Sequence, residues 1–276
     1  MLEKLNSCGD DFIPSYLHPL FGANNDAEMF SQMVWISFFY TLSVALSMAL
    51  FPAPYGRYSS SKYGFLLPAK IAWITQESPS FIMPVILLLT TSSAFWNSTV
   101  NKMLLIGFII HYVNRSIIFP LCARGNEDTP FIPYISAMAF SIFNGFMQGH
   151  YLLNYYLYDE QWLTSPQFII GFTMFCVGMA INIHSDQQLI HLRKPGETGY
   201  KMPVGGLFEY VTAPNFFAEI IEWTGFAIAS CSPPAAVFAF FSTVFLCYRA
   251  WHHHHFYLKK FDNYPRSRKI IIPFVF

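Results

Sequence analysis

The sequence predicts an all-α fold: a polytopic integral membrane protein built as a bundle of seven transmembrane helices. Of its 276 residues, 54% are hydrophobic and only 12% are charged, whereas a typical soluble domain has roughly 25% charged residues. Several stretches are almost free of charge over the roughly 20 residues that a helix needs to cross a bilayer. This composition has too little charge to cover a water-exposed surface, so lipid is the expected solvent.

Long gaps between charged residues mark five of the predicted helices. These gaps lie within residues 29–51, 71–96, 103–123, 129–158 and 161–183. In the second helix, Pro79 disfavours helical geometry at Ser78 and loosens the backbone there. A further uncharged stretch is interrupted at Pro233 and Pro234, which would break a continuous helix. We therefore divide residues 210–255 into two helices, which brings the predicted number to seven.

Positive charge is distributed unevenly between the two ends of the predicted bundle. Lys and Arg gather in the first, third and fifth loops and in the C-terminal tail, whereas the other end receives only Lys4 and Lys102. Cytoplasmic loops of membrane proteins retain the excess of positive charge. We therefore expect residues 1–28 to be an exterior or lumenal segment, residues 29–258 the seven-helix membrane domain and residues 259–276 a cytoplasmic tail. The expected membrane is the endoplasmic reticulum in a eukaryote and the inner membrane in a bacterium.

Charge and cysteine content argue against several classes of function. The net charge is zero and no basic arm stands out, so no nucleic-acid partner is expected. The five cysteines have no CxxC spacing and predict neither a disulfide framework nor a zinc site. The four consecutive histidines from His252 to His255 would point in different directions on a helix, so we expect no metal there. A monomer is expected.

Ionisable groups within the predicted helices are few, and such groups usually face a bundle interior and mark a site. The second helix carries Gln76 and Glu77, and the third carries His111, Tyr112 and Arg115. His111 and Arg115 are four residues apart and so share one helix face. A purely structural alternative is an ion pair between Glu77 and Arg115 that holds the two helices together.

Three polar stripes lie at or near the expected cytoplasmic ends of the last three helices when residues are placed at about 100° per position. The stripes are Asn182, Asp186 and Arg193; Asn215, Glu219 and Glu222; and Arg249, His253 and Tyr257. One stripe alone would fit a solvated rim. Three together favour a polar ligand that carries phosphate, because Arg pairs with phosphate and the amides and carboxylates suit hydroxyl groups. No G-x-G-x-x-G motif is present, so helix ends and loops would have to bind a dinucleotide.

Four linked motifs identify a family resemblance. They are IHSD within residues 181–186, RKPGETGY at 193–200, GGLFEYV at 205–211 and NFFAEIIEW at 215–223. Together they resemble the steroid 5α-reductases, and the similarity extends from about Tyr55 to the end of the chain. It is closer to the type 1 and type 2 steroid enzymes than to the polyprenol or enoyl-CoA branches.

This resemblance implies a seven-helix enzyme that reduces a Δ4-3-oxo steroid with NADPH. Gln76, Glu77 and Tyr112 match the family's residues at the steroid 3-oxo group, with Arg115 behind them. The positions on the cofactor side are Asn182, Asp186, Arg193, Tyr200, Lys201, Asn215, Glu219, Arg249, His253 and Tyr257. Lys201 stands where some relatives have Arg, and Lys is not an equivalent phosphate partner.

The residues at the 3-oxo group and the residues on the cofactor side would serve the same reaction. Hydride transfer to the β-carbon of an enone places negative charge on the carbonyl oxygen, which a donor in a dry cavity stabilises. Tyr112 can donate, as can a buried, protonated Glu77 that Gln76 orients. The adjacent carbon then takes a proton from a donor that the sequence does not identify.

The sequence also allows other functions for the same residues. A reductase of another lipid enone or of an enoyl thioester would use the same scaffold. A methyltransferase would use the cofactor-side carboxylates and Arg for S-adenosylmethionine. A transporter or proton channel would also carry Glu77 and Arg115 within a bundle, although no internal repeat is visible. The choice among testosterone, progesterone and other enones depends on apolar helix faces that the sequence does not align.

Overall fold

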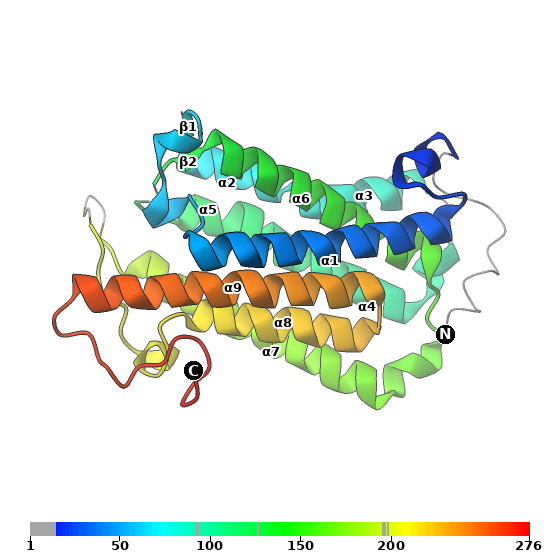
Figure 1. The fold of residues 1–276 in the computed structure, drawn as a ribbon. Helices are drawn as coiled ribbons and strands as arrows, with labels where there is room; N and C mark the ends of the chain where they lie inside the picture. Colours follow the sequence, from blue (N-terminus) through cyan, green and yellow to red (C-terminus); the bar gives the residue numbers. More distant parts are fainter. Residues whose placement is uncertain (1–14, 92–93, 126, 195–196, 198) are drawn as a thin grey trace.

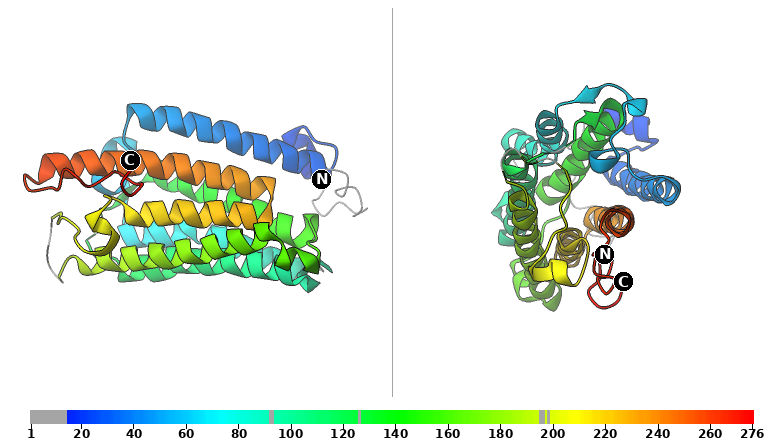
Figure 2. Two further views of the ribbon diagram at one scale, coloured as in Figure 1. Left: turned by 90° about the horizontal axis from the view of Figure 1, so that it is seen from below. Right: turned by 90° about the vertical axis from the view of Figure 1, so that its left-hand side faces the viewer.

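The computed structural model describes residues 15–91, 94–125, 127–194, 197 and 199–276. Long helices lie side by side along most of its length (Figures 1 and 2), and the one sheet in the described part has two short strands. The first half of the predicted exterior segment, up to residue 14, lies outside the described residues, as does Lys4. The all-α prediction is therefore confirmed for the described part of the chain.

Side chains cap the N-termini of four of the main helices. The main helices are α1 (Asp26–Leu50), α2 (Ala69–Glu77), α3 (Pro79–Thr90), α4 (Thr99–Val113), α5 (Phe119–Cys122), α6 (Phe131–His150), α7 (Pro166–His191), α8 (Pro214–Ser230) and α9 (Pro233–Lys260). Asn25 caps α1 by accepting the Glu28 backbone N–H at 2.9 Å. Ser232 caps α9, whose first residues are Pro233 and Pro234. The predicted break before these prolines is confirmed.

Five stretches are long and apolar enough to cross a membrane, judged over the described residues. They are His18–Leu50, Ala69–Thr90, Thr99–Cys122, Pro166–His191 and Pro233–Lys260. These are the helices of an integral membrane protein. The 20-residue α6 and the 17-residue α8 run alongside them. Seven membrane crossings stay a prediction, for which these five stretches are candidates.

Two of the spanning stretches are locally irregular next to the predicted polar residues. α2 ends at Glu77 and α3 begins at Pro79, but Ser78 between them keeps helical angles, φ −55° and ψ −33°. The predicted loss of helical geometry at Ser78 is therefore wrong, and Pro79 interrupts only the hydrogen-bond ladder, because it has no N–H. Between α4 and α5 the backbone widens into a π-helical turn, Asn114–Ile118, which contains Arg115. Such wide turns occur often at functional sites. Both irregularities lie where the sequence predicts intramembrane polar groups.

Glycines allow the backbone of α6 to contact the backbone at the junction of α2 and α3. A Cβ added at Gly145 would lie 2.8 Å from the backbone oxygens of Pro79 and Ser80. A Cβ added at Gly149 would lie 2.9 Å from the Cα of Pro84. α6 is therefore held directly against the segment that follows Glu77.

The α7–α8 pair is packed even more closely, through glycines on both helices. A Cβ at Gly178 of α7 would lie 2.5 Å from the Glu222 backbone nitrogen, and one at Gly171 would lie 2.3 Å from the Ala229 nitrogen. On α8, a Cβ at Gly225 would lie 2.5 Å from the Phe175 nitrogen. Small residues permit this backbone approach at helix interfaces in membranes.

Three loops and the C-terminal segment meet at one end of the bundle, where α9 extends beyond its neighbours (Figure 1). There β1 (Leu66–Leu67) pairs antiparallel with β2 (Thr129–Pro130). The C-terminal segment returns to the loop before α8, and Thr212 N–H donates to the Lys269 oxygen at 2.9 Å. This is the end that carries the predicted excess of Lys and Arg; its cytoplasmic orientation stays a prediction.

Enlarging Gly178 tests the α7–α8 contact. We expect Gly178→Val to lower the free energy of unfolding by about 1–3 kcal/mol, because overpacking forces the two backbones apart. Val177→Leu is the matched control, since Val177 is 49% exposed on the outer face of the same helix. Thermal melting of the purified protein in detergent measures both. Equal melting temperatures for Gly178→Val and wild type would contradict the close packing.

Candidate functional site

A pocket opens at the loop-rich end of the bundle, among the ends of α5, α7, α8 and α9. Its volume, counted to the open mouth, is about 820 Å³. Six of the ten predicted cofactor-side residues line it: Arg193, Tyr200, Lys201, Asn215, His253 and Tyr257. Most of the polar residues that line this pocket could therefore be predicted from the sequence.

The pocket is cationic, and no Asp or Glu is among the residues that line it. Arg57 and Arg124, from the first and third loops, add two positive charges that the sequence analysis did not assign to the site. Lys201 forms an ion pair with Glu197, so that its charge is partly balanced. The hydrogen bond from Lys201 is also the main reason that the pKa of Glu197 is lowered. An anionic ligand would find the arginines better available than Lys201.

Aromatic rings hold Arg57 in place. Its guanidinium lies 4.5 Å from the ring centre of Phe256, 4.9 Å from Tyr257 and 5.0 Å from Tyr200. Nη2 donates to the Tyr257 hydroxyl at 3.4 Å, whereas Nη1 is buried without a hydrogen-bond partner. Burial raises the pKa of the Tyr200 hydroxyl, so that ring stays neutral beside the two arginines it contacts. A buried, unpaired guanidinium nitrogen is an available donor for a bound anion.

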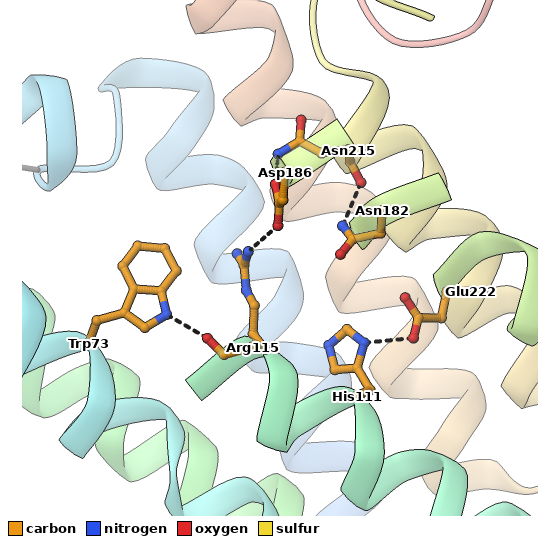
Figure 3. Close-up of polar contacts among 7 residues, drawn as sticks. All are labelled: Trp73, His111, Arg115, Asn182, Asp186, Asn215 and Glu222. Carbon is orange, nitrogen blue, oxygen red and sulfur yellow. Dashed lines mark hydrogen bonds and ion pairs between the residues drawn. The ribbon is translucent and has the colours of Figure 1, made fainter. Parts of the chain in front are cut away.

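Asn182 and Asp186 of α7 contact Asn215 of α8, which lines the pocket (Figure 3). Asn182 donates to the Asn215 backbone oxygen at 2.9 Å, and Asn215 donates to Asp186 Oδ1 at 3.0 Å. All three side chains are at least 92% buried. Arg193 does not continue this face as predicted, because α7 ends at His191 and Arg193 instead donates to the Gly125 oxygen at 2.7 Å. It still reaches the pocket, from a loop.

Glu219 and Arg249 do not line the pocket, although their side chains are in the same region. Arg249 is buried, with its guanidinium 4.1 Å from the ring centre of Tyr55, and Nε and Nη1 have no hydrogen-bond partner. One carboxylate oxygen of Glu219 is also buried and unpartnered. Desolvation raises the pKa of the Tyr55 hydroxyl, although Arg249 opposes the shift.

The four consecutive histidines do point in different directions, as their spacing predicts. His252 contacts the Met48 oxygen at 3.1 Å, and His254 contacts the Thr212 hydroxyl at 2.6 Å. His255 contacts the Trp251 oxygen at 2.9 Å. His253 lines the pocket, and its Nε2 is buried without a partner. His253 is thus the histidine of this run that is available to a ligand in the pocket.

A second polar group lies where α2 contacts the π-helical turn that follows α4. Gln76 and Tyr112 are 7% and 5% exposed, and Gln76 Oε1 has no hydrogen-bond partner. Trp73, one turn before Glu77 on α2, donates its indole N–H to the Arg115 backbone oxygen at 3.1 Å (Figure 3). This contact fixes the helix that carries Gln76 and Glu77 against the helix that carries Tyr112.

The ion pair between Glu77 and Arg115 that the sequence allowed is absent among the described side chains. Arg115 instead pairs with Asp186 of α7, with Nη1 3.6 Å from Oδ2. His111 pairs with Glu222 of α8, at 2.6 Å between Nδ1 and Oε1. The pair is deeply buried, since His111 is 3% exposed and Glu222 is not exposed at all. Glu222 therefore belongs to the interior, not to the mouth where its stripe was predicted.

Comparisons with known proteins agree on one family. The family model described as 3-oxo-5-alpha-steroid 4-dehydrogenase matches residues 127–276. 3-oxo-5-alpha-steroid 4-dehydrogenase 1 of Rattus norvegicus is 45% identical over 247 residues, covering 90% of this chain and 95% of the relative. The type 1 protein of Homo sapiens is 47% identical, covering 80% and 86%. The type 2 protein of Mus musculus is 47% identical, covering 82% and 89%.

The ion-pair arrangement predicts different stability effects for two carboxylates. Asp186→Ala should lower the free energy of unfolding by about 2 kcal/mol or more, because it removes the ion-pair partner of the partly buried Arg115 and the acceptor for the Asn215 amide. Glu77→Gln should change stability little, since Glu77 has no such pair. Thermal melting without added cofactor measures both. Glu197→Gln, at a surface ion pair, controls for the loss of a carboxylate. A larger loss for Glu77→Gln than for Asp186→Ala would restore the Glu77–Arg115 alternative.

Proposed function

The chain belongs to the 3-oxo-5-alpha-steroid 4-dehydrogenase family and is an oxidoreductase that acts on 3-oxo steroids; on this basis we propose that it transfers a hydride from NADPH to the Δ4 double bond and releases the 5α-reduced 3-oxo steroid. One observation carries the proposal: Asn215 of the cationic pocket is hydrogen-bonded to Asp186, and Asp186 pairs with Arg115, one turn after Tyr112. A transporter or channel function would not account for membership in a family of dehydrogenases.

The residues of the pocket suit a dinucleotide with a 2′-phosphate. NADPH, when bound, supplies the hydride for the substrate's β-carbon. Arg57 Nη1, Arg249 Nε and His253 Nε2 are buried polar atoms without partners in the protein, and such atoms ordinarily find one. Arg57, Arg124 and Arg193 would hold the phosphates, because arginine matches phosphate geometry with paired donors. Asn182, Asp186 and Asn215 would bind and orient the polar groups nearer the bundle interior.

On the substrate side, Tyr112, Glu77 and Gln76 would act on the steroid's 3-oxo group. Tyr112 would donate a hydrogen bond to the carbonyl oxygen as negative charge develops there. Glu77 would donate from its protonated form, and Gln76 would orient it. Arg115 would support the group through its π-helical turn, where its backbone oxygen is held by Trp73. The surrounding apolar and aromatic side chains, such as Phe108 and Trp223, would exclude water from the reaction.

Steroid-dependent oxidation of NADPH tests the proposed reaction and its donor. We expect turnover with testosterone or progesterone, and Tyr112→Phe should lower kcat by about 10² to 10³ because it removes an oxyanion donor. Glu77→Gln should lower kcat as well, while both variants keep NADPH affinity. The 5α-reduced product is identified by mass spectrometry against standards. Wild-type protein that binds NADPH but reduces only a non-steroid enone or an enoyl thioester would favour the other-substrate alternative.

Preference for NADPH over NADH tests the arginines of the pocket. Arg57→Gln and Arg193→Gln should each lower kcat/KM for NADPH by about 10-fold or more with much less effect on NADH, since a charge-assisted phosphate contact is lost. Lys62→Gln is the control, because Lys62 is an exposed cation of the first loop outside the pocket lining. Equal kcat/KM values for the two cofactors in the wild type would show that these charges orient the chain in the membrane and do not recognise the 2′-phosphate.

A further inference from the structure

A chain of three hydrogen bonds runs from the first turn of α9 across α6 to Tyr112 on α4. Gln148 Nε2 lies 3.0 Å from the Pro234 backbone oxygen and 3.2 Å from Asn144 Oδ1. Asn144 Nδ2 lies 3.3 Å from the Tyr112 hydroxyl oxygen. Gln148, Asn144 and Tyr112 are 1%, 2% and 5% exposed. The chain is therefore shielded from water along its whole length.

The direction of every hydrogen bond in this chain follows from its first member. A backbone carbonyl can only accept, so the Gln148 group facing Pro234 must be its NH₂. The second hydrogen of the same NH₂ then goes to Asn144, which must present its oxygen. Asn144 consequently turns its own NH₂ toward Tyr112. Neither amide can flip without bringing two acceptors or two donors together in a buried place, which costs about 1–3 kcal/mol.

The last member of the chain is a hydroxyl whose orientation is now restricted. Tyr112 has one hydrogen to donate, and its oxygen already accepts from Asn144. The hydroxyl hydrogen must therefore point away from Asn144, which leaves it for a substrate oxygen or for the Ser80 side chain. Hydrogen bonds in a chain also polarise one another, so a phenol that accepts at its oxygen is a better donor at its hydrogen.

We propose that Asn144 and Gln148 are positioning residues that fix the Tyr112 hydroxyl as a donor toward the substrate's carbonyl oxygen. This inference rests on the proposed function, because it assigns a cause to the orientation of the group that stabilises the oxyanion. The fixed orientation saves the reorganisation that a freely rotating hydroxyl would undergo as charge develops. Asn144 and Gln148 act through Tyr112 and do not themselves touch the substrate.

The first test reverses the polarity of one link without changing its shape. An ionised carboxylate at position 144 cannot donate to Tyr112 and would accept its hydrogen instead. A buried carboxyl without a cation beside it tends to stay protonated, so kcat of Asn144→Asp is measured across a range of pH and should fall by about 10-fold or more as the carboxyl ionises. Asn144→Leu removes the donor and the acceptor at every pH, and its kcat should fall by a similar factor. KM for the steroid and affinity for NADPH should change by less than about threefold. Wild-type kcat in a folded Asn144→Leu protein would overturn the proposal.

A double-mutant cycle with Tyr112→Phe separates positioning from a general structural role. If Asn144 acts through the Tyr112 hydroxyl, Asn144→Asp should lower kcat little further once that hydroxyl is gone. If the fold-decreases in kcat of the two single variants multiply in the double variant, Asn144 acts elsewhere and the proposal is overturned. If Asn144→Asp does not fold, Gln148→Met tests the chain from its far end. Gln148→Met frees the Asn144 amide to flip, so kcat should fall. That fall should disappear in combination with Tyr112→Phe.

Ser80 is the competing partner of the Tyr112 hydroxyl. It lies against α6 beside Asn144, since its backbone oxygen is 2.8 Å from a Cβ built at Gly145, and its side chain is within reach of the Tyr112 hydroxyl. If the Tyr112 hydrogen serves the substrate, Ser80→Ala should leave kcat within about twofold of wild type. A loss as large as that of Asn144→Leu, abolished in Tyr112→Phe, would mean that the hydroxyl hydrogen points to Ser80 and would overturn the proposal. Absence of steroid turnover in wild type would contradict the proposed function itself, which these variants do not test.

Discussion

Backbone-to-backbone packing of α7 against α8 is the constraint on which the polar interior depends. Helices gain no hydrophobic free energy by associating within lipid, so close van der Waals contact and interhelical hydrogen bonds must hold them together. Gly171, Gly178 and Gly225 allow that contact. Only at this separation does Asn182 of α7 reach the Asn215 backbone oxygen of α8. The hydrogen bonds between Asn182, Asp186 and Asn215 therefore depend on glycines, which carry no side chain at all.

Much of the site could be predicted from one sequence because helical geometry and family motifs constrain it independently. Asn182 and Asp186 were expected on one helix face, and both contact Asn215 or its backbone. The resemblance to the steroid 5α-reductases is confirmed by the family model and the relatives. The same helical spacing was wrong for Arg193, because it assumed that α7 continues beyond His191. Helix ends are the least predictable feature of a sequence.

Pairings between helices could not be predicted, because a sequence shows where a residue lies along its helix but not which neighbour it faces. Glu77 and Asp186 were equally acceptable partners for Arg115 by charge. The structure selects Asp186 through the π-helical turn and the position of α7. Arg57 was missed for a related reason. Its loop carries no polar stripe, and its place beside Tyr200 and Tyr257 depends on how that loop folds across α9.

The return of the C-terminal segment has a consequence for remote substitutions. Thr212 lines the pocket and donates to the Lys269 oxygen, and Arg268 donates to the Pro203 oxygen at 3.0 Å. These contacts join residues that are 57 and 65 positions apart in the sequence. The wall of the pocket therefore leans on a segment that reaches no ligand itself. A change in that segment could loosen ligand binding while leaving every lining side chain as it was.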